Sequence, residues 1–175
     1  MPTDTIYGLV ALATNRKSVA RMYGLKKREK KPGTLIAANV DQLIKLGLDE
    51  KSLRLAAGLW PNPLSVIIAT SPRLRYLDQG LGDLAVRIPA HDELRRLLEK
   101  TGPLVTSSAN HPGEQPANNV RGAQEYFGAA VDFYADGGDL AGRPPSTVAR
   151  LSGGRLQILR QGAAVIGDSN GLSVK

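Results

Sequence analysis

The 175-residue sequence contains no cysteine and only two histidines, His91 and His111. The lack of cysteine excludes disulfides, thiolate nucleophiles, and the zinc and iron–sulfur sites that need cysteine ligands. Two histidines are too few for a histidine-rich metal site. The sequence also shows no arrangement that indicates a Ser–His–Asp catalytic triad. A cysteine nucleophile and a metal centre built from cysteine or histidine are therefore excluded.

Long apolar runs are also missing. No run approaches the roughly 20 residues that a helix needs to cross a bilayer, and the start Met1–Asp4 has neither the basic flank nor the apolar stretch of a signal peptide. We therefore expect a cytoplasmic protein that does not bind membranes. The length and a hydrophobic share of 42% predict one globular domain over residues 1–175, with 161–175 as a tail.

Aromatic residues make up only 5% of the chain, whereas cations are in excess. Lys and Arg number 23 against 16 Asp and Glu, so the net charge is +7. This excess suits an anionic partner such as a nucleotide or a nucleic acid, although ordinary solubility charge explains it equally well. Few aromatics make a poor single-strand binder, because such binders stack bases on rings.

Short apolar segments alternate between the helical period and the strand period, and this pattern predicts a layered α/β domain with a mixed sheet. Gly153 and Gly154 indicate a hairpin turn between the last two strands, so the sheet is not purely parallel. The expected helices cover 15–27, 41–46, 49–59, 92–100 and 120–127, and the expected strands cover 34–38, 64–69, 84–88, 103–106, 131–135, 147–151 and 155–160. His91, followed by two acidic residues, is interpreted as a helix start rather than part of a catalytic dyad.

Three polar segments stand out, and ligands of open α/β sheets bind at strand ends. Residues 2–8 (PTDTIYG) and 106–110 (TSSAN) offer hydroxyls and backbone amides to a small ligand, but both are also typical of turns. Five of the six residues 26–31 are cations. They suit a phosphate, and they equally complement the carboxyl end of a helix.

Arg87 and Arg160 lie within apolar strand patterns. Burying a guanidinium is costly unless it faces a carboxylate or a phosphate. A structural ion pair and a ligand-binding role are both consistent with this placement. The usual nucleotide motifs GxxxxGK[ST] and GxGxxG are absent, and the loop Asp136–Asp139 lacks the further ligands of a calcium-binding loop.

Together, these segments resemble the YrdC family, the threonylcarbamoyl-AMP synthases, in order and spacing. The similarity extends over nearly the whole chain. The matching blocks are PTDTIYGL at 2–9, Lys26-x-Arg28, LWPNPLS at 59–65, VRIPAH at 86–91, TSSAN at 106–110, PSTV at 145–148 and ILRQGA at 158–163.

The resemblance implies a twisted mixed β-sheet flanked by helices around a positively charged cleft. It also implies a reaction that joins L-threonine, bicarbonate and ATP into threonylcarbamoyl-AMP and releases pyrophosphate, with Mg²⁺ accompanying the ATP and no metal ligand from the protein. The product would pass to a downstream threonylcarbamoyl transferase that modifies tRNA at the adenosine next to the anticodon. The basic cleft would bind tRNA or another RNA.

The resemblance also assigns roles to individual residues. Lys26 and Arg28 are the expected catalytic residues. The expected ATP-binding residues are Lys26, Arg28, Ser108, Asn110 and Arg160, and the expected threonine-binding residues are Thr5, Arg87, Thr106 and Ser146. A guanidinium suits the threonine carboxylate because it binds it with two parallel hydrogen bonds.

The sequence departs from the family pattern at several points. Family members usually carry a helix and a strand before PTDT, and without them we expect an exposed sheet edge or an incomplete pocket. Glu29, Asn62 and Ser65 replace the usual proline, glycine and threonine. Two alternatives therefore stay open: a non-catalytic protein that binds double-stranded RNA or tRNA, and an inactive paralogue.

Overall fold

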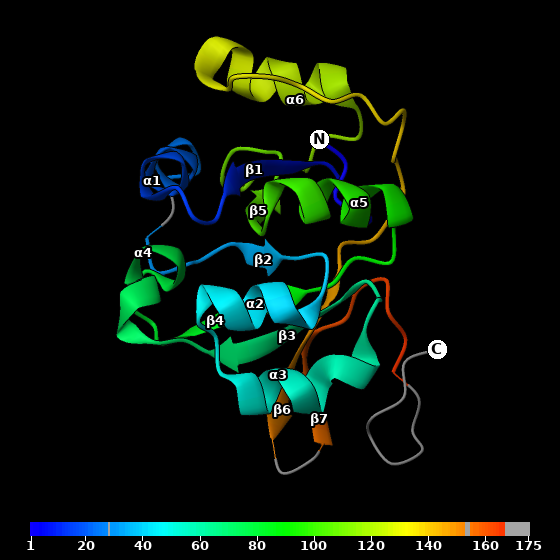
Figure 1. Cartoon of the computed structure of the whole chain (residues 1–175). Coiled ribbons are helices and arrows are strands. Elements are labelled where there is room, and N and C mark those ends of the chain that lie inside the picture. Colours follow the sequence, from blue (N-terminus) through cyan, green and yellow to red (C-terminus); the bar gives the residue numbers. More distant parts are fainter. Residues whose placement is uncertain (28, 153–154, 167–175) are drawn as a thin grey trace.

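The computed structural model describes residues 1–27, 29–152 and 155–166, and seven strands of this part form one sheet. The strands are β1 (Gly8–Leu12), β2 (Thr34–Ile36), β3 (Leu64–Ala69), β4 (Asp83–Arg87), β5 (Leu104–Ser108), β6 (Thr147–Ser152) and β7 (Arg155–Arg160). Their spatial order is β1-β5-β2-β4-β3-β6-β7 (Figure 1). The pairs β2–β4 and β3–β6 are parallel and the others antiparallel, which confirms the predicted mixed α/β sheet.

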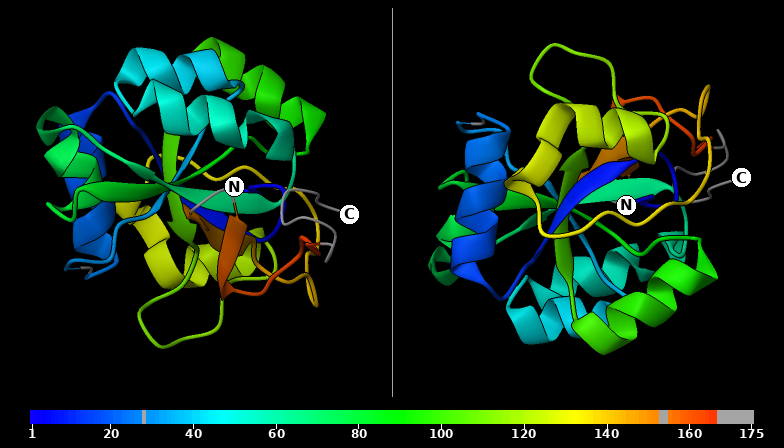
Figure 2. Two further views of the ribbon diagram at one scale, coloured as in Figure 1. Left: turned by 90° about the horizontal axis from the view of Figure 1, so that it is seen from below. Right: turned by 90° about the horizontal axis from the view of Figure 1, so that it is seen from above.

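Helices cover both faces of the sheet. Figure 2 shows α2, α3 and α5 grouped on one side of the strands and α6 on the other. The α-helices are α1 (Arg16–Leu25), α2 (Val40–Leu46), α3 (Glu50–Ala56), α4 (Arg75–Asp78), α5 (Asp92–Thr101) and α6 (Val120–Phe127), and the 3₁₀ turns are η1 (Ala57–Leu59), η2 (Pro72–Leu74) and η3 (Gly128–Ala130). None of these helices is long and apolar enough to span a bilayer.

Local sequence explains where the helices begin. The side chain of Asn15 accepts a hydrogen bond from the Ser18 N–H at 3.1 Å, which caps α1. His91 Nδ1 accepts from the Leu94 N–H at 3.3 Å and caps α5 in the same way. The prediction that His91 marks a helix start is therefore confirmed.

The core explains why the central strands are fully apolar. Leu64, Val66 and Val86 are completely buried, because helices cover both faces of the strands. A smaller apolar group joins α5 to β2 and β5 on one face. These contacts hold β3, β4 and β5 in place, and the three strands carry Ser65, Arg87 and Ser108.

One strand was not predicted, and one predicted strand is wrong. Residues 8–12 were assigned to no element, but they form β1, which pairs with β5 along all five residues. Residues 131–135 were expected to form a strand, but they take an irregular course. Side chains rather than a strand ladder hold this segment, since Asp132 accepts from Arg21 at 2.8 Å and the Tyr134 hydroxyl donates to the Gly128 carbonyl.

The predicted tail begins with ordered contacts. The Ala163 N–H donates to the Pro145 carbonyl at 2.8 Å, and the Thr147 hydroxyl donates to the Ala164 carbonyl at 2.7 Å. Residues 161–164 are thus bonded to the start of β6. Residues 167–175 lie outside the described part of the chain, as do the predicted turn residues 153–154.

Gly162 offers a test of this packing. A Cβ at Gly162 would lie 2.2 Å from the Pro145 carbonyl oxygen, which is backbone and has no side-chain freedom to move away. We expect Gly162→Ala to lower the free energy of unfolding by about 1–3 kcal/mol in urea titration. Gly58→Ala is the control, because nothing lies within 4 Å of its Cβ position; its expected effect is below about 1 kcal/mol and stabilising. Equal urea midpoints for the two variants would contradict this packing.

Candidate functional site

Arg87, the last residue of β4, is the most deeply buried arginine of the candidate site, with 3% of its surface exposed. Its guanidinium donates to the Ser65 hydroxyl at 3.0 Å, to the Thr3 carbonyl at 3.1 Å and to Asp4 Oδ1 at 2.9 Å. The last contact is an ion pair whose two side chains are each 3% exposed. The carboxylate that Arg87 requires therefore comes from the start of the chain.

The same hydrogen bonds continue across the sheet to β7. The Ser65 hydroxyl donates to the Ser146 hydroxyl at 3.1 Å, and Arg160 donates to the Ser146 carbonyl at 2.7 Å. We call Asp4, Arg87, Ser65, Ser146 and Arg160 the Arg87 network. It connects two predicted threonine-binding residues, Arg87 and Ser146, to one predicted ATP-binding residue, Arg160.

Arg160 differs from the expectation in its burial. Its apolar sequence context suggested a buried guanidinium, but Arg160 is exposed, as are Ile158 and Leu159 beside it. The reason is topological, because β7 forms an edge of the sheet and packs against fewer neighbours. An exposed guanidinium keeps surface that a phosphate can contact.

Burial dominates the electrostatics of the Asp4–Arg87 pair. It raises the pKa of the Asp4 carboxyl above its ordinary value, and the nearby Arg87 charge opposes that rise. Burial also lowers the pKa of Arg87, against the attraction of Asp4. Each charge thus favours the ionised form of the other, against the effect of burial.

Lys26 forms a second polar centre at the carboxyl end of α1. Its side chain is 2% exposed, and its Nζ donates to the Ser108 carbonyl at 2.7 Å and to Asn110 Oδ1 at 2.7 Å. It also donates to the Asn110 carbonyl. Lys26, Ser108 and Asn110, all predicted to bind ATP, therefore lie together, and we call them the Lys26 network. Arg28 lies outside the described residues.

Thr106 lies beside the start of the chain. A Cβ at Gly8 would be 2.5 Å from Thr106 Oγ1 and 2.8 Å from Thr3 Cγ2, so only glycine permits this close approach. Thr106 Oγ1 is buried and has no hydrogen-bond partner among the described residues. Thr5, the remaining predicted threonine-binding residue, is 5% exposed and follows Asp4 directly.

Sequence reasoning missed three contributors to this region: Asp4, Ser65 and Tyr7. The Tyr7 hydroxyl donates to the Gly138 carbonyl at 2.9 Å and accepts from the Gly137 N–H at 2.8 Å, which ties the 131–146 segment to the PTDT segment. Asp4 and Tyr7 belong to a block that was recognised, but a linear block does not reveal its contacts. For Asp4, the signal in the sequence was Arg87, because an arginine in an apolar strand needs an acidic partner.

Acidic and histidine side chains do not gather anywhere in the described part of the chain. No group of three or more that could hold a metal ion occurs among residues 1–27, 29–152 and 155–166. A Mg²⁺ ion at this site would have to take most of its ligands from phosphate oxygens and water, which Mg²⁺ commonly does.

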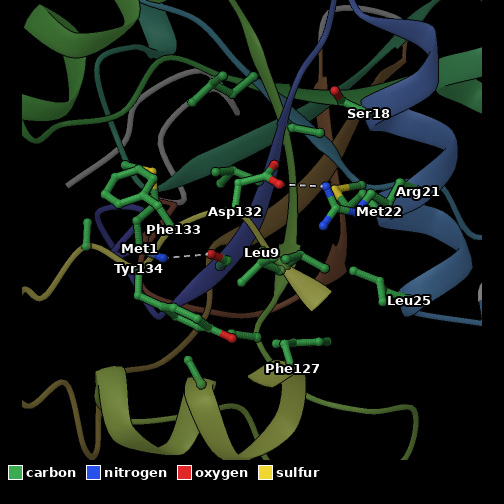
Figure 3. A pocket seen from close by; sticks show the side chains of 18 of the residues that line it. Met1, Leu9, Ser18, Arg21, Met22, Leu25, Phe127, Asp132, Phe133 and Tyr134 are labelled. Carbon is green, nitrogen blue, oxygen red and sulfur yellow. Dashed lines mark hydrogen bonds and ion pairs between the residues drawn. The ribbon is translucent and has the colours of Figure 1, made fainter. Parts of the chain in front are cut away.

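A cavity of about 460 Å³ lies elsewhere, along β1 between α1, α5 and α6 (Figure 3). Its walls are mainly apolar, with Leu9, Met22 and Phe127 among them. The half-buried Met1 ammonium donates to the Gly8 carbonyl, and burial lowers its pKa to about 6. None of the predicted site residues that the structure describes lines this cavity, and its apolar walls do not suit a triphosphate.

Comparison with known proteins supports the sequence resemblance. A family model described as "Telomere recombination", which groups Sua5, YciO and YrdC, matches residues 1–162. The chain is 36% identical over 158 residues to the threonylcarbamoyl-AMP synthase of Chromohalobacter salexigens, covering 87% of this chain and 85% of that protein. It is 34% identical over 160 residues to the corresponding enzyme of Pseudomonas aeruginosa, covering 89% and 86%.

Solved structures share the fold. Pyrococcus abyssi Sua5 in complex with L-threonine superposes with a TM-score of 0.81 at 32% identity. The match covers 93% of this chain but only 49% of the P. abyssi protein, so the chain spans about half the length of that relative. Escherichia coli YciO gives a TM-score of 0.76 at 23% identity and covers 93% of this chain and 81% of that one.

The burial of Lys26 has a consequence for stability. Replacing Lys26 by Met removes the ammonium that donates to three oxygens of Ser108 and Asn110, so we expect Lys26→Met to lower the free energy of unfolding by about 2–4 kcal/mol. Lys17→Met is the matched control, because Lys17 is an exposed residue of the same helix; its expected effect is within about 0.5 kcal/mol. Chemical denaturation checks both. A Lys26→Met variant as stable as Lys17→Met would show that these bonds contribute nothing.

Proposed function

The chain belongs to the Sua5/YciO/YrdC family, and from this membership and the geometry of the site we propose that it is a threonylcarbamoyl-AMP synthase. The reaction consumes L-threonine, bicarbonate and ATP and releases pyrophosphate. The observation that carries the proposal is the Arg87 network. Its hydrogen bonds join the residues assigned to the amino acid to Arg160, which is assigned to the nucleotide.

Arg87 binds the α-carboxylate of threonine in this proposal. Its guanidinium is charged, buried and held in place by three contacts, so it loses little freedom when a carboxylate arrives. Fixing the carboxylate leaves the amino group to react. The amine attacks the carbon of bicarbonate, a C–N bond forms, and water leaves to give the carbamate.

The carbamate oxygen then attacks the α-phosphorus of ATP, and pyrophosphate departs with increasing negative charge. Arg160 on β7 and the cations at the end of α1, Lys26 and Arg28, are assigned to stabilise that charge. Mg²⁺, when bound with the nucleotide, neutralises phosphate oxygens. No covalent intermediate on the protein is required, which agrees with a chain that has no cysteine. Catalysis then consists of positioning and electrostatic stabilisation.

The Lys26 network has a more specific task. Because Lys26 is bonded to Ser108 and Asn110, it fixes the TSSAN segment at the end of β5. The hydroxyl of Ser108 in turn donates to Asn110 Oδ1 at 2.6 Å. We propose that this network orients the Ser108 hydroxyl and the Asn110 amide toward the nucleotide and holds the Lys26 charge near the phosphates.

The product is a reactive mixed anhydride, so a downstream threonylcarbamoyl transferase is the expected consumer, and tRNA the final acceptor. The net charge of +7 suits direct contact with tRNA. We place the reaction in the cytoplasm.

The test is pyrophosphate release by the purified full chain. We expect release only when L-threonine, bicarbonate and ATP are all present, and mass spectrometry should detect threonylcarbamoyl-AMP. Pyrophosphate release that does not depend on threonine would contradict the assignment. Tight binding of double-stranded RNA or tRNA without any turnover would favour the non-catalytic alternative.

Arg160 provides a residue-level prediction. Arg160→Met removes a cation next to Ser146, so we expect KM for ATP to rise about 10-fold or more, with a smaller change in KM for threonine. Arg155→Met is the matched control, because Arg155 is also an exposed arginine and lies at the other end of β7. Its KM for ATP should stay within about twofold of the parent value. Steady-state pyrophosphate assays compare the two, and an equal response would remove Arg160 from the nucleotide site.

A further inference from the structure

The Asp4–Arg87 pair leaves one atom on each partner unused. The two side chains meet through a single contact, Arg87 to Asp4 Oδ1 at 2.9 Å. Asp4 Oδ2 and Arg87 Nε are both buried, and neither has a hydrogen-bond partner among the described residues. An ion pair with only a structural purpose is better served by the two parallel bonds that arginine and carboxylate readily form. The leftover acceptor and donor therefore need another explanation.

The backbone holds Asp4 in this position at some cost. Asp4 has φ of 68°, in the left-handed region that L-residues avoid. Two bonds close the turn around it, because the Thr3 N–H and the Thr3 hydroxyl both donate to the Ile6 carbonyl, at 3.1 and 2.9 Å. Such conformations persist where the surrounding structure enforces them, and they concentrate at functional sites.

The two unused atoms match the two charged ends of an α-amino acid. An α-carboxylate accepts from a guanidinium N–H, and an α-ammonium donates to a carboxylate oxygen. The carboxylate and the ammonium of the ligand are bonded to one carbon atom. They are therefore close enough together to contact a guanidinium and a carboxylate that are paired with each other. Binding would produce an alternating arrangement of four charges, in which every charge has neighbours of opposite sign.

We propose that Asp4 binds the α-ammonium of the amino-acid substrate through Oδ2 and thereby determines selectivity for an α-amino acid over an analogue that lacks the amino group. This inference rests on the proposed function, since it takes Arg87 as the site of the α-carboxylate. In this proposal Asp4 contacts the substrate amine. Thr106 Oγ1, which belongs to a predicted threonine-binding residue, is also buried without a described partner and lies near Thr3.

The test compares ligands that lack one charge each. L-threonine, L-threoninamide, which lacks the carboxylate, and (R)-3-hydroxybutanoate, which lacks the ammonium, are titrated calorimetrically into the full chain. We expect threonine to bind about 10- to 100-fold more tightly than (R)-3-hydroxybutanoate. In Asp4→Asn this ratio should fall below about 3-fold, while threonine should still bind more tightly than threoninamide, because Arg87 keeps its charge.

Asp83→Asn is the matched control. Asp83 lies at the other end of β4 and pairs with Arg150 at 2.8 Å, so the same chemical change is made away from the Arg87 network. Both ligand ratios should keep their parent values in this variant.

Two results would overturn the inference. One is an Asp4→Asn variant that still prefers threonine over (R)-3-hydroxybutanoate by the full factor. The other needs no variant and so does not depend on how well Asp4→Asn folds: equal affinity of the parent chain for the two ligands. Either result leaves the proposed function standing if threonine-dependent pyrophosphate release is observed. A parent chain that neither binds threonine nor releases pyrophosphate would count against both.

Discussion

The buried charge of Arg87 is the constraint on which the rest of the site depends. A guanidinium with 3% exposure needs several acceptors at once, because burying an ion without partners costs several kcal/mol. Its partners come from two separate parts of the chain, the PTDT segment and β3, and Ser65 extends the contacts to Ser146, just before β6. Satisfying one cation therefore fixes the N-terminal segment against the centre of the sheet.

Lys26 repeats the same arrangement at the end of β5. A buried ammonium collects carbonyl and amide oxygens from Ser108 and Asn110, and this determines the course of a segment that has no regular structure. Both centres place a cation where a strand ends and the backbone becomes irregular. Electrostatic satisfaction, rather than a hydrogen-bonded ladder, gives these segments their shape.

Much of the fold was predictable because it depends on local periodicity. Residues 64–69 read as a buried strand and residues 120–127 as a helix, and both have those bounds in the structure. The missed strand and the wrong one both concern non-local pairing. Residues 8–12 become a strand because β5 offers a partner, whereas residues 131–135 lack one and use Asp132 and Tyr134 instead. For the site, the burial of Arg87 was predictable from its apolar neighbours, but its partner Asp4, 83 residues away, was not.

The placement of these cations also explains how a chain without a nucleophilic cysteine could perform an activation reaction. A site that must stabilise growing negative charge works best when its positive groups are already fixed, because they need not reorient as the charge develops. Arg87 is fixed by three contacts, and Lys26 by three more. Arg160 is exposed and bonded to Ser146, so it joins this fixed frame to the surface from which a nucleotide would arrive. The fixed charge of Arg87 suits the amino acid, and the fixed charge of Lys26 holds the segment after β5. The exposed charge of Arg160 suits ATP, which is larger and more highly charged.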